Sequence, residues 1–338
     1  MLTIDGSAGE GGGQILRSSL ALSMCLGRPF RIHHIRAARK RPGLQAQHLA
    51  AVQAAARVSM AEVDGAHKGS QELVFRPQQI VAGNYEFDIG TAGSTTLVLQ
   101  TILPALILAD DESSLLLGGG THNPFAPAFD FLDAAFLPLL NRMGPTVTAS
   151  LLRPGFAPAG GGQVRVQVKP VQGLQSLLLP ERGEIVQQSA EILLANLPEH
   201  IAWREWAVIR DALGWPESNL NLHLVNSASG AGNAVMIIIR SALITECFTS
   251  FGQRGVPAER VAGSAVSEVR RYLQAGVPVG RYLADQLLLP MALAGSGMFI
   301  SLRPSQHVIT NIMVIKKFMQ VEFELEELQP DRWRISLS

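Results

Sequence analysis

Three segments of the chain share one pattern, in which a glycine-rich loop opens into a run of apolar residues long enough for a helix. They cover residues 5–24, 87–108 and 278–297. Glycine lets backbone amides converge on an anion, and the first amides of a helix add favourable potential, so each loop is a candidate phosphate site. For one loop taken alone, a tight turn is the simpler interpretation. The dinucleotide-binding and P-loop spacings are absent, so neither of those sites is predicted.

The sequence after each glycine-rich loop also repeats. A strand-like run, a loop, a helix and two further strand-like runs follow, and we predict three copies of one β-α-β-α-β-β unit in an α+β fold. In the second unit a helix is indicated by apolar side chains at helical spacing and a glycine suited to the C-terminal cap, namely Leu132, Phe136, Leu139, Met143 and Gly144.

Extra sequence before the third loop has its own rhythm of strands and helices. Strand-like runs occur at residues 185–197, 234–240 and 247–252, and helical patterns at 199–214 and 257–276. The stretch is long enough to bury a small core, so we predict an inserted small α/β domain over residues 183–275. The large three-repeat domain then comprises residues 1–182 and 276–338.

Charge is balanced overall but unevenly distributed. The 338 residues include 28 basic and 28 acidic side chains, and this balance argues against a long nucleic-acid footprint. Residues 11–61 contain no Asp or Glu, and Arg39, Lys40 and Arg41 are adjacent. We expect part of this segment to face an anion; a solvated basic loop is the alternative.

Other classes of protein are disfavoured. Cys25 and Cys247 are far apart in apolar surroundings, so neither a redox pair nor a zinc motif is predicted, and both are expected to be reduced core residues. No secretory signal and no uninterrupted apolar run of about 18 residues is present. We therefore expect a cytoplasmic protein that does not enter a membrane.

His307 is predicted to lie in a turn between a strand-like run and an apolar helix that begins at residue 308. A largely neutral imidazole can attack phosphorus without a separate base, so this residue is a candidate nucleophile. A lone histidine near a helix start is more often a cap or a packing residue. The remaining motifs therefore decide between the two interpretations.

Seven segments in order resemble the RNA 3'-terminal phosphate cyclase family: residues 5–23, 35–49, 90–106, 118–131, 155–162, 280–295 and 307–312. The resemblance extends over essentially the whole chain. It implies three repeats similar to the C-terminal domain of translation initiation factor 3, with a smaller domain inserted in the third. Enolpyruvyl transferases share the large-domain architecture, so fold alone does not choose between the two activities.

The resemblance also implies a reaction in three steps that uses ATP and Mg²⁺ or Mn²⁺. His307 attacks the α-phosphorus of ATP, AMP passes to an RNA 3'-phosphate, and the neighbouring 2'-hydroxyl closes a 2',3'-cyclic phosphate. Positioning and electrostatics would dominate such phosphoryl chemistry. A related group of proteins keeps the fold without the histidine and serves ribosome assembly; the presence of His307 argues against that scaffold function.

Residue roles follow from this chemistry. Glu10 is the candidate metal contact, with a helix N-terminal charge as the alternative. The candidate ligands of RNA or ATP phosphates are Arg17, Arg39, Arg41 and His48. The positions that match the nucleotide site are Gln100 and Pro127 at the adenine pocket and the segment Tyr282, Leu283, Ala284, Asp285 and Gln286. Asp285 could orient His307 or bind ribose or metal.

Two positions depart from the family pattern. Pro154 and Ala157 stand where the family's glycine-rich signature usually carries a basic and an aromatic residue. We expect these two departures to affect contacts with the RNA end more than the attack by His307. The expected partner is an RNA 3'-phosphate end, and the protein is expected to be a monomer or a homodimer.

Overall fold

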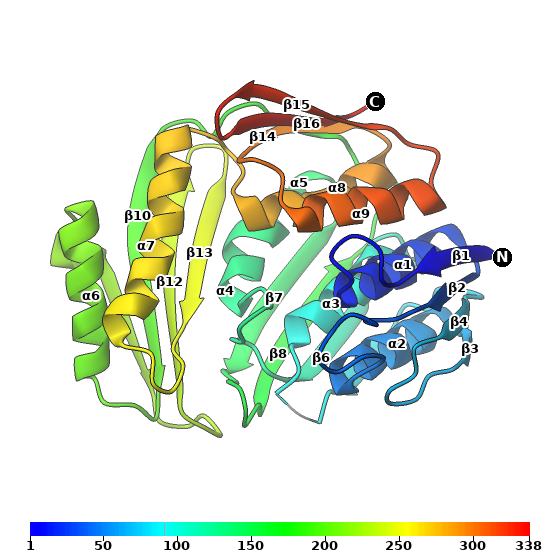
Figure 1. The fold of residues 1–338 in the computed structure, drawn as a ribbon, viewed down its shortest axis with the longest axis horizontal. Coiled ribbons are helices and arrows are strands. Elements are labelled where there is room, and N and C mark those ends of the chain that lie inside the picture. Colours follow the sequence, from blue (N-terminus) through cyan, green and yellow to red (C-terminus); the bar gives the residue numbers. More distant parts are fainter. Residues whose placement is uncertain (91) are drawn as a thin grey trace.

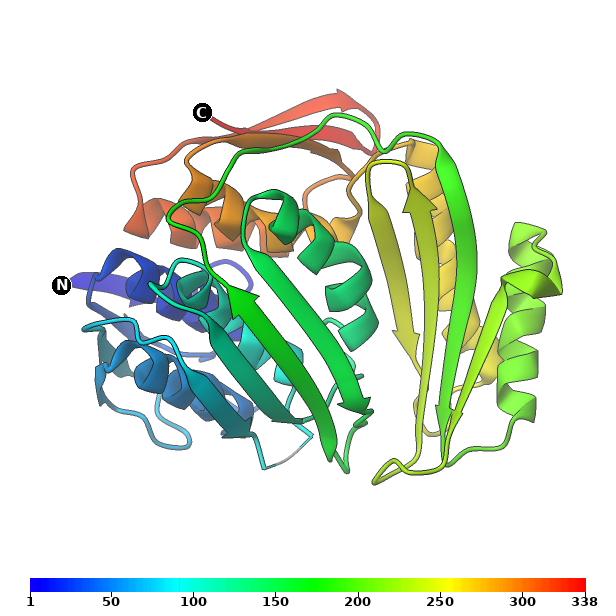
Figure 2. The same cartoon turned by 180° about the vertical axis from the view of Figure 1, so that it is seen from behind.

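The computed structural model describes residues 1–90 and 92–338; Thr91, in the second glycine-rich loop, lies outside the described residues. The described chain folds into four four-stranded sheets with helices between and beside them (Figure 1). Three sheets surround a central group of helices, and Figure 2 shows one of them in front of those helices. The mixed α/β class expected from the sequence is confirmed.

The three outer sheets have the same topology. In each, the first two strands are parallel, and the fourth lies antiparallel between the second and the third. Parallel neighbours need a crossover connection, which a helix after a glycine-rich loop supplies in each case.

The bounds of these elements are as follows. The first sheet comprises β1 (Leu2–Asp5), β2 (Phe30–His33), β4 (Leu73–Arg76) and β3 (Glu62–Asp64), with α1 (Gly13–Leu26) and α2 (Ala46–Ser59). The second comprises β5 (Asn84–Asp88), β6 (Ser113–Gly119), β8 (Gly162–Lys169) and β7 (Thr146–Arg153), with α3 (Thr95–Leu106), α4 (Phe129–Phe131), a π-helical turn η1 (Leu132–Phe136) and α5 (Leu137–Arg142). The third comprises β9 (Leu177–Leu179), β14 (Gly297–Ser301), β16 (Arg332–Leu337) and β15 (Phe323–Gln329), with α8 (Arg281–Ala294) and α9 (Gln306–Phe318).

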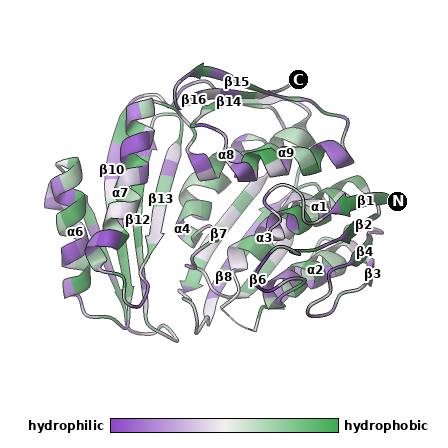
Figure 3. Ribbon diagram, in the orientation of Figure 1, coloured by the Kyte–Doolittle hydropathy of each residue, from purple (hydrophilic) through white to green (hydrophobic). Residues whose placement is uncertain are grey.

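The fourth sheet is formed by the stretch predicted to be inserted. Its strands, in spatial order, are β11 (Leu220–Val225), β10 (Ile185–Ala195), β12 (Gly232–Ser241) and β13 (Thr245–Phe251). Helices α6 (His200–Leu213) and α7 (Ala258–Ala275) pack on one face, and a short 3₁₀ turn η2 (Glu217–Asn219) precedes β11. In Figure 3 the strands β10 and β12 are mostly hydrophobic, whereas α6 alternates between hydrophobic and hydrophilic residues.

The two faces of this fourth sheet contribute to different cores. Trp206 and Ile209 of α6 and Val261 of α7 cluster on the helix-covered face. Met236 and Cys247 on the opposite face join the main core, beside α4 and η1. Cys25 and Cys247 are both free thiols in apolar surroundings, as predicted. None of the described helices is long and apolar enough to cross a membrane.

The central helices pack against one another to hold the site. Helix α1 contacts both α3 and α9, and α8 contacts α9. Three of these helices begin directly after loops that were singled out in the sequence. Helix α1 follows the first glycine-rich loop, α8 begins after Gly280, and α9 begins after Ser305. Three segments far apart in the sequence are therefore neighbours in space.

Candidate active site

The first glycine-rich loop joins β1 to α1 and packs closely against α9. Gly9 and Gly11 have φ of 56° and 59°, a left-handed conformation that favours glycine. A side chain at Gly9 would begin 2.4 Å from Thr310 Oγ1 on α9, and the backbone N–H of Glu10 donates to that same hydroxyl at 3.0 Å. The close approach fixes Glu10 beside the first turn of α9.

The N-terminus of α1 carries unsatisfied amide groups. Its N-cap is Gly12, which offers no side-chain hydrogen bond, and its first turn has no acidic residue. The first N–H groups of a helix and its dipole together favour an anion. The predicted phosphate-binding character of this loop therefore has a local structural basis.

His307 lies on the first turn of α9, which begins at Gln306; the prediction that it lies in a turn before the helix was wrong. The reason is Ser305, whose hydroxyl accepts from the N–H of Val308 and so starts the helix two residues earlier than expected. The imidazole is about half exposed, with 46% of the side chain accessible. It is therefore reachable from solvent and not buried in hydrocarbon.

The two ring nitrogens of His307 differ in their hydrogen bonding. Nδ1 lies 2.7 Å from Oε1 of Gln14 and 2.9 Å from Oε2 of Glu10. Both partners are acceptors, so Nδ1 carries the hydrogen, and the neutral ring has its lone pair on Nε2. Across residues 1–90 and 92–338, no hydrogen bond to Nε2 is formed.

Glu10 and His307 influence each other's protonation. The hydrogen bond to Glu10 raises the pKa of His307, and partial burial opposes this. The same hydrogen bond lowers the pKa of Glu10, and Arg39, which pairs with Oε1 of Glu10, acts in the same direction. The pair therefore favours an imidazolium and a carboxylate, and a neutral imidazole requires a higher pH or a new partner for Glu10.

A network of buried side chains supports this pair. Gln14 Nε2 donates to Oδ1 of Asp285 at 2.6 Å, and Asn311 Nδ2 donates to the same oxygen at 3.1 Å. Asn311 Oδ1 accepts from the Ser18 hydroxyl at 2.8 Å. Burial raises the pKa of Asp285. Because these residues come from α1, α8 and α9, the network fixes the three helices relative to one another.

The network continues to α3 and borders a small cavity. Gln286 donates to Oδ2 of Asp285 at 3.2 Å, and Gln100 donates to Oε1 of Gln286. A cavity of about 70 Å³ lies here, between polar side chains of the network and the apolar Leu103 and Phe136. Ligand pockets commonly measure several hundred cubic ångströms, so this cavity alone is too small to hold a ligand of that size.

Two basic groups converge on Gly13. A side chain there would begin 2.6 Å from Nε2 of His48 and 2.8 Å from Nη1 of Arg17. Nδ1 of His48 accepts from the N–H of Gln45 at 3.2 Å, so Nε2 carries the hydrogen and is a donor. Burial, with Arg17 and Arg36, lowers the pKa of His48 to about 3, and burial lowers that of Arg17 to about 10. Near neutral pH the two side chains are thus a neutral donor and a cation beside the α1 amides.

The other predicted phosphate ligands differ in placement. Arg39 joins the cluster, donating to the carbonyl and carboxylate of Glu10. Arg41 is exposed, and within the described chain only its carbonyl is engaged, accepting from Arg36 at 2.7 Å. The structure therefore brings Arg39 to Glu10, the partner of His307, whereas no side-chain contact of Arg41 with this group is found among the described residues.

The predicted nucleotide-binding residues also differ in their surroundings. The Thr96 hydroxyl donates to the carbonyl of Pro127 at 2.8 Å, which anchors that loop on α3. Tyr282 is 56% exposed and lies under the guanidinium of Arg281. Leu283 and Ala284 are buried in the main core, where they hold α8 in place. Their assignment to the nucleotide site stays a prediction.

Sequence reasoning missed Gln14, Ser18 and Asn311, which are all less than 8% exposed. A signal for them exists. Gln14 and Ser18 are four residues apart on α1, and so are His307 and Asn311 on α9. Polar residues at this spacing in otherwise apolar helices share one face, and a buried polar face needs partners on a neighbouring element.

Comparison with known proteins gives a consistent result. A family model described as RNA 3'-terminal phosphate cyclase matches residues 8–325. The chain is 50% identical over 339 residues to the RNA 3'-terminal phosphate cyclase of Koribacter versatilis (strain Ellin345), covering 100% of this chain and 95% of that protein. It is 50% identical over 336 residues to the protein of the same name from Ectopseudomonas mendocina (strain ymp), covering 99% and 98%.

A solved structure, the enolpyruvyl transferase NikO from Streptomyces tendae, aligns with 96% of this chain and 46% of that chain at 11% identity. The TM-score is 0.37, which supports no argument about fold or function.

Proposed function

The chain belongs to the RNA 3'-terminal phosphate cyclase family, and from this premise we propose that it converts an RNA 3'-terminal phosphate to a 2',3'-cyclic phosphate at the expense of ATP, through a covalent bond between His307 and AMP. One observation supports this most directly. The imidazole is oriented through Nδ1, and Nε2 is left available beside a helix N-terminus and a group of basic side chains.

In the first step, Nε2 of His307 attacks the α-phosphorus and forms an N–P bond, while the bond to the leaving pyrophosphate breaks. Positive charge develops on the ring as this happens. Glu10 lies 2.9 Å from Nδ1 and stabilises that charge, and Gln14 keeps the ring from rotating. Hydrogen bonds that fix a nucleophile lower the barrier because no reorganisation is needed during the reaction.

In the second and third steps, a terminal phosphate oxygen of the RNA displaces His307 from AMP, and the 2'-hydroxyl then displaces AMP to close the ring. Arg17, Arg39 and His48 would hold the RNA phosphate against the α1 amides, and their closeness to Gly12, Gly13 and Glu10 supports this role. Arg17 and Arg39 can donate to two phosphate oxygens at once. Arg41, which lies away from this group, would contact RNA further from the end.

The residues around Glu10 fit a divalent cation only in part. Glu10 supplies one carboxylate, and its oxygens face His307 and Arg39. Mg²⁺ or Mn²⁺ is commonly held by one or two carboxylates together with substrate phosphates, so Glu10 would bind it jointly with ATP. A bound ion would supply charge to offset the phosphates, and by engaging Glu10 it would favour the neutral form of His307.

The architecture is proposed in the same way. The shared topology of the three outer sheets supports three copies of one unit, similar to the C-terminal domain of translation initiation factor 3. The separate apolar cluster under α6 and α7 supports an inserted domain over residues 183–275. A cytoplasmic location and a monomeric or homodimeric state also remain proposals.

Incubation with ATP labelled at the α-phosphate tests the function. We expect acid-labile, alkali-stable label on the wild-type protein and none on His307→Ala, whereas His67→Ala, at an exposed histidine, keeps it. Label that persists in His307→Ala would exclude this nucleophile. A protein that takes no label but binds structured RNA would instead be a scaffold of the same fold.

A further inference from the structure

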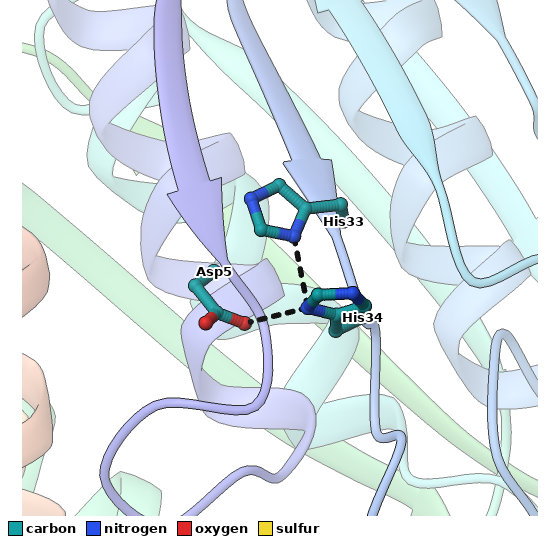
Figure 4. A group of neighbouring side chains, drawn as sticks. All are labelled: Asp5, His33 and His34. Carbon is teal, nitrogen blue, oxygen red and sulfur yellow. Dashed lines mark hydrogen bonds and ion pairs between the residues drawn. The ribbon is translucent and has the colours of Figure 1, made fainter.

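Three potential metal ligands meet at the ends of β1 and β2, outside the site described above. Asp5 and His33 are register partners on these parallel strands. Their side chains belong to the outer face of the sheet, because Ile4 and Ile32 beside them point into the core. Figure 4 shows the Asp5 carboxylate and both imidazoles of His33 and His34 gathered at one point.

His34 reaches this point through an unusual backbone conformation. Adjacent residues of a strand face opposite sides, so His34 would normally point away from His33. Its φ of 54° is in the left-handed region, which a residue with a side chain seldom adopts. The result is that the two ring centroids are 4.5 Å apart and the two Nδ1 atoms are 3.0 Å apart. Such strain is often associated with a binding site.

The distances suit a small cation that takes nitrogen and oxygen ligands. Oδ1 of Asp5 lies 3.4 Å from Nδ1 of His34, and all three ligand atoms lie within 4.8 Å of one another. Two nitrogens bound tetrahedrally to zinc at 2.0–2.1 Å are about 3.3 Å apart. Two imidazoles and a carboxylate, with water in a fourth position, form a common zinc ligand set.

Ser7 orients the carboxylate among these three side chains. The backbone N–H and the hydroxyl of Ser7 donate to Oδ1 of Asp5 at 3.0 and 2.7 Å, which orients the carboxylate, as groups around metal ligands commonly do. The hydrogen bond between the two Nδ1 atoms requires a hydrogen on one of them. A divalent cation would replace that hydrogen and accept both lone pairs.

We propose that Asp5, His33 and His34 form a zinc-binding site at the base of the first glycine-rich loop. The N–H of Gly6 donates to the carbonyl of His33 at 2.7 Å, so an ion here would lock β1 and β2 together where that loop begins. The loop carries Glu10, and a fixed base would steady its position. The site itself does not depend on the proposed reaction, and its ligands are distinct from Glu10 and His307.

Calorimetric titration of the chelator-stripped full chain with Zn²⁺, without ATP, tests the proposal. We expect one ion per chain, unaffected by a large excess of Mg²⁺ because imidazole nitrogens disfavour that ion. Substitutions His34→Gln and Asp5→Asn should each weaken binding at least about tenfold, as changes around metal ligands typically do. With Co²⁺ in place of Zn²⁺, visible absorption of the bound ion should be lost in His34→Gln.

Two controls make the result specific. His67→Gln, at an exposed histidine on the same half of the chain, should bind Zn²⁺ as the wild type does. His307→Ala should also keep the ion, because His307 pairs with Glu10 and is not one of the three proposed ligands. The proposal is wrong if no stoichiometric binding occurs, if binding is unchanged in His34→Gln, or if binding is lost in His307→Ala. Circular dichroism of each variant confirms that it is folded.

Discussion

Glu246 holds the N-terminus of α8, the helix that carries Asp285. It lies on β13, it is 2% exposed, and its Oε1 accepts from the N–H of Gly280, the N-cap of α8. A side chain on Gly280 would begin 2.9 Å from that oxygen, so the carboxyl group would have to shift to accommodate it. The fourth sheet thus reaches the active-site helices through one buried carboxyl group.

Burial raises the pKa of Glu246 from its ordinary 4.5 to about 8, although backbone hydrogen bonds from Gly280 and Cys247 oppose this. Between these two pH values the folded state binds one proton more than the unfolded state. The free energy of unfolding therefore falls by about 1.4 kcal/mol per pH unit over that window, and by at most about 5 kcal/mol in total. Below pH 4.5 both states are protonated, and this contribution to the pH dependence disappears.

The substitution Glu246→Gln keeps the acceptor for Gly280 and removes the titration. We expect equal stability of variant and wild type near pH 4.5 and a growing advantage for the variant up to about pH 8. Urea denaturation at several pH values measures this difference in the free energy of unfolding. Labelling of His307 by ATP should be unchanged, because α8 keeps its cap. Parallel pH profiles for the two proteins would refute the reasoning.

Glu205, on a helix that packs on the same sheet, provides a matched control. It is fully buried on α6, its Oε1 accepts from Asn233 at 2.8 Å, and burial raises its pKa to about 7. Glu205→Gln should also flatten the pH profile of stability, over a narrower window that ends near pH 7. The hydrogen bond of Glu205 is to Asn233 and not to the α8 N-terminus, so Glu205→Ala should leave labelling intact, whereas Glu246→Ala should reduce it by removing the α8 cap.

Four further predictions concern the candidate active site. In Glu10→Gln the pKa of His307 should fall toward 6.5, since the hydrogen bond to the carboxylate is the main cause of its rise; NMR titration of the ring measures this. For the wild type, label formation should increase with pH through that raised pKa, because only the neutral ring attacks, and a flat profile would contradict the assignment. Asn311→Ala leaves Ser18 and Asp285 short of partners and should lower the free energy of unfolding by about 1–3 kcal/mol in urea. Arg17→Lys should slow transfer of AMP to RNA by about tenfold or more, while labelling of the protein falls less, as single-turnover assays with a 3'-phosphate RNA would show.

Much of the fold follows from local pattern. The predicted strand over 185–197 and the helices over 199–214 and 257–276 correspond to β10, α6 and α7 to within a few residues. Two strands were missed for physical reasons. β9 has three residues and exists because it pairs with β14, and β11 is a half-exposed strand joined to its sheet only through β10. Pairing of this kind depends on the tertiary fold and leaves little trace in the local sequence.

The site shows the same division between local and long-range information. The glycine-rich loop and Ser305 specify where α1 and α9 begin, and these are visible in the sequence. The contact of His307 with Gln14 joins residues 293 positions apart, and nothing local predicts it. The assignment of Glu10 as a metal contact considered its charge, whereas the structure shows it beside the imidazole, where it also raises the pKa of His307.

The buried polar residues explain how such distant segments are aligned. An uncompensated polar group in the core costs several kcal/mol, so Gln14 and Asn311 are tolerated only where both meet Asp285. A shift of α1 against α9 by one turn would leave several donors and acceptors without partners, whereas apolar packing alone would tolerate it better. The network therefore selects one register of α1, α8 and α9, and that register is the one that places Glu10 beside His307. Polar positions four residues apart on otherwise apolar helices are thus evidence for alignment of a site as well as for its chemistry.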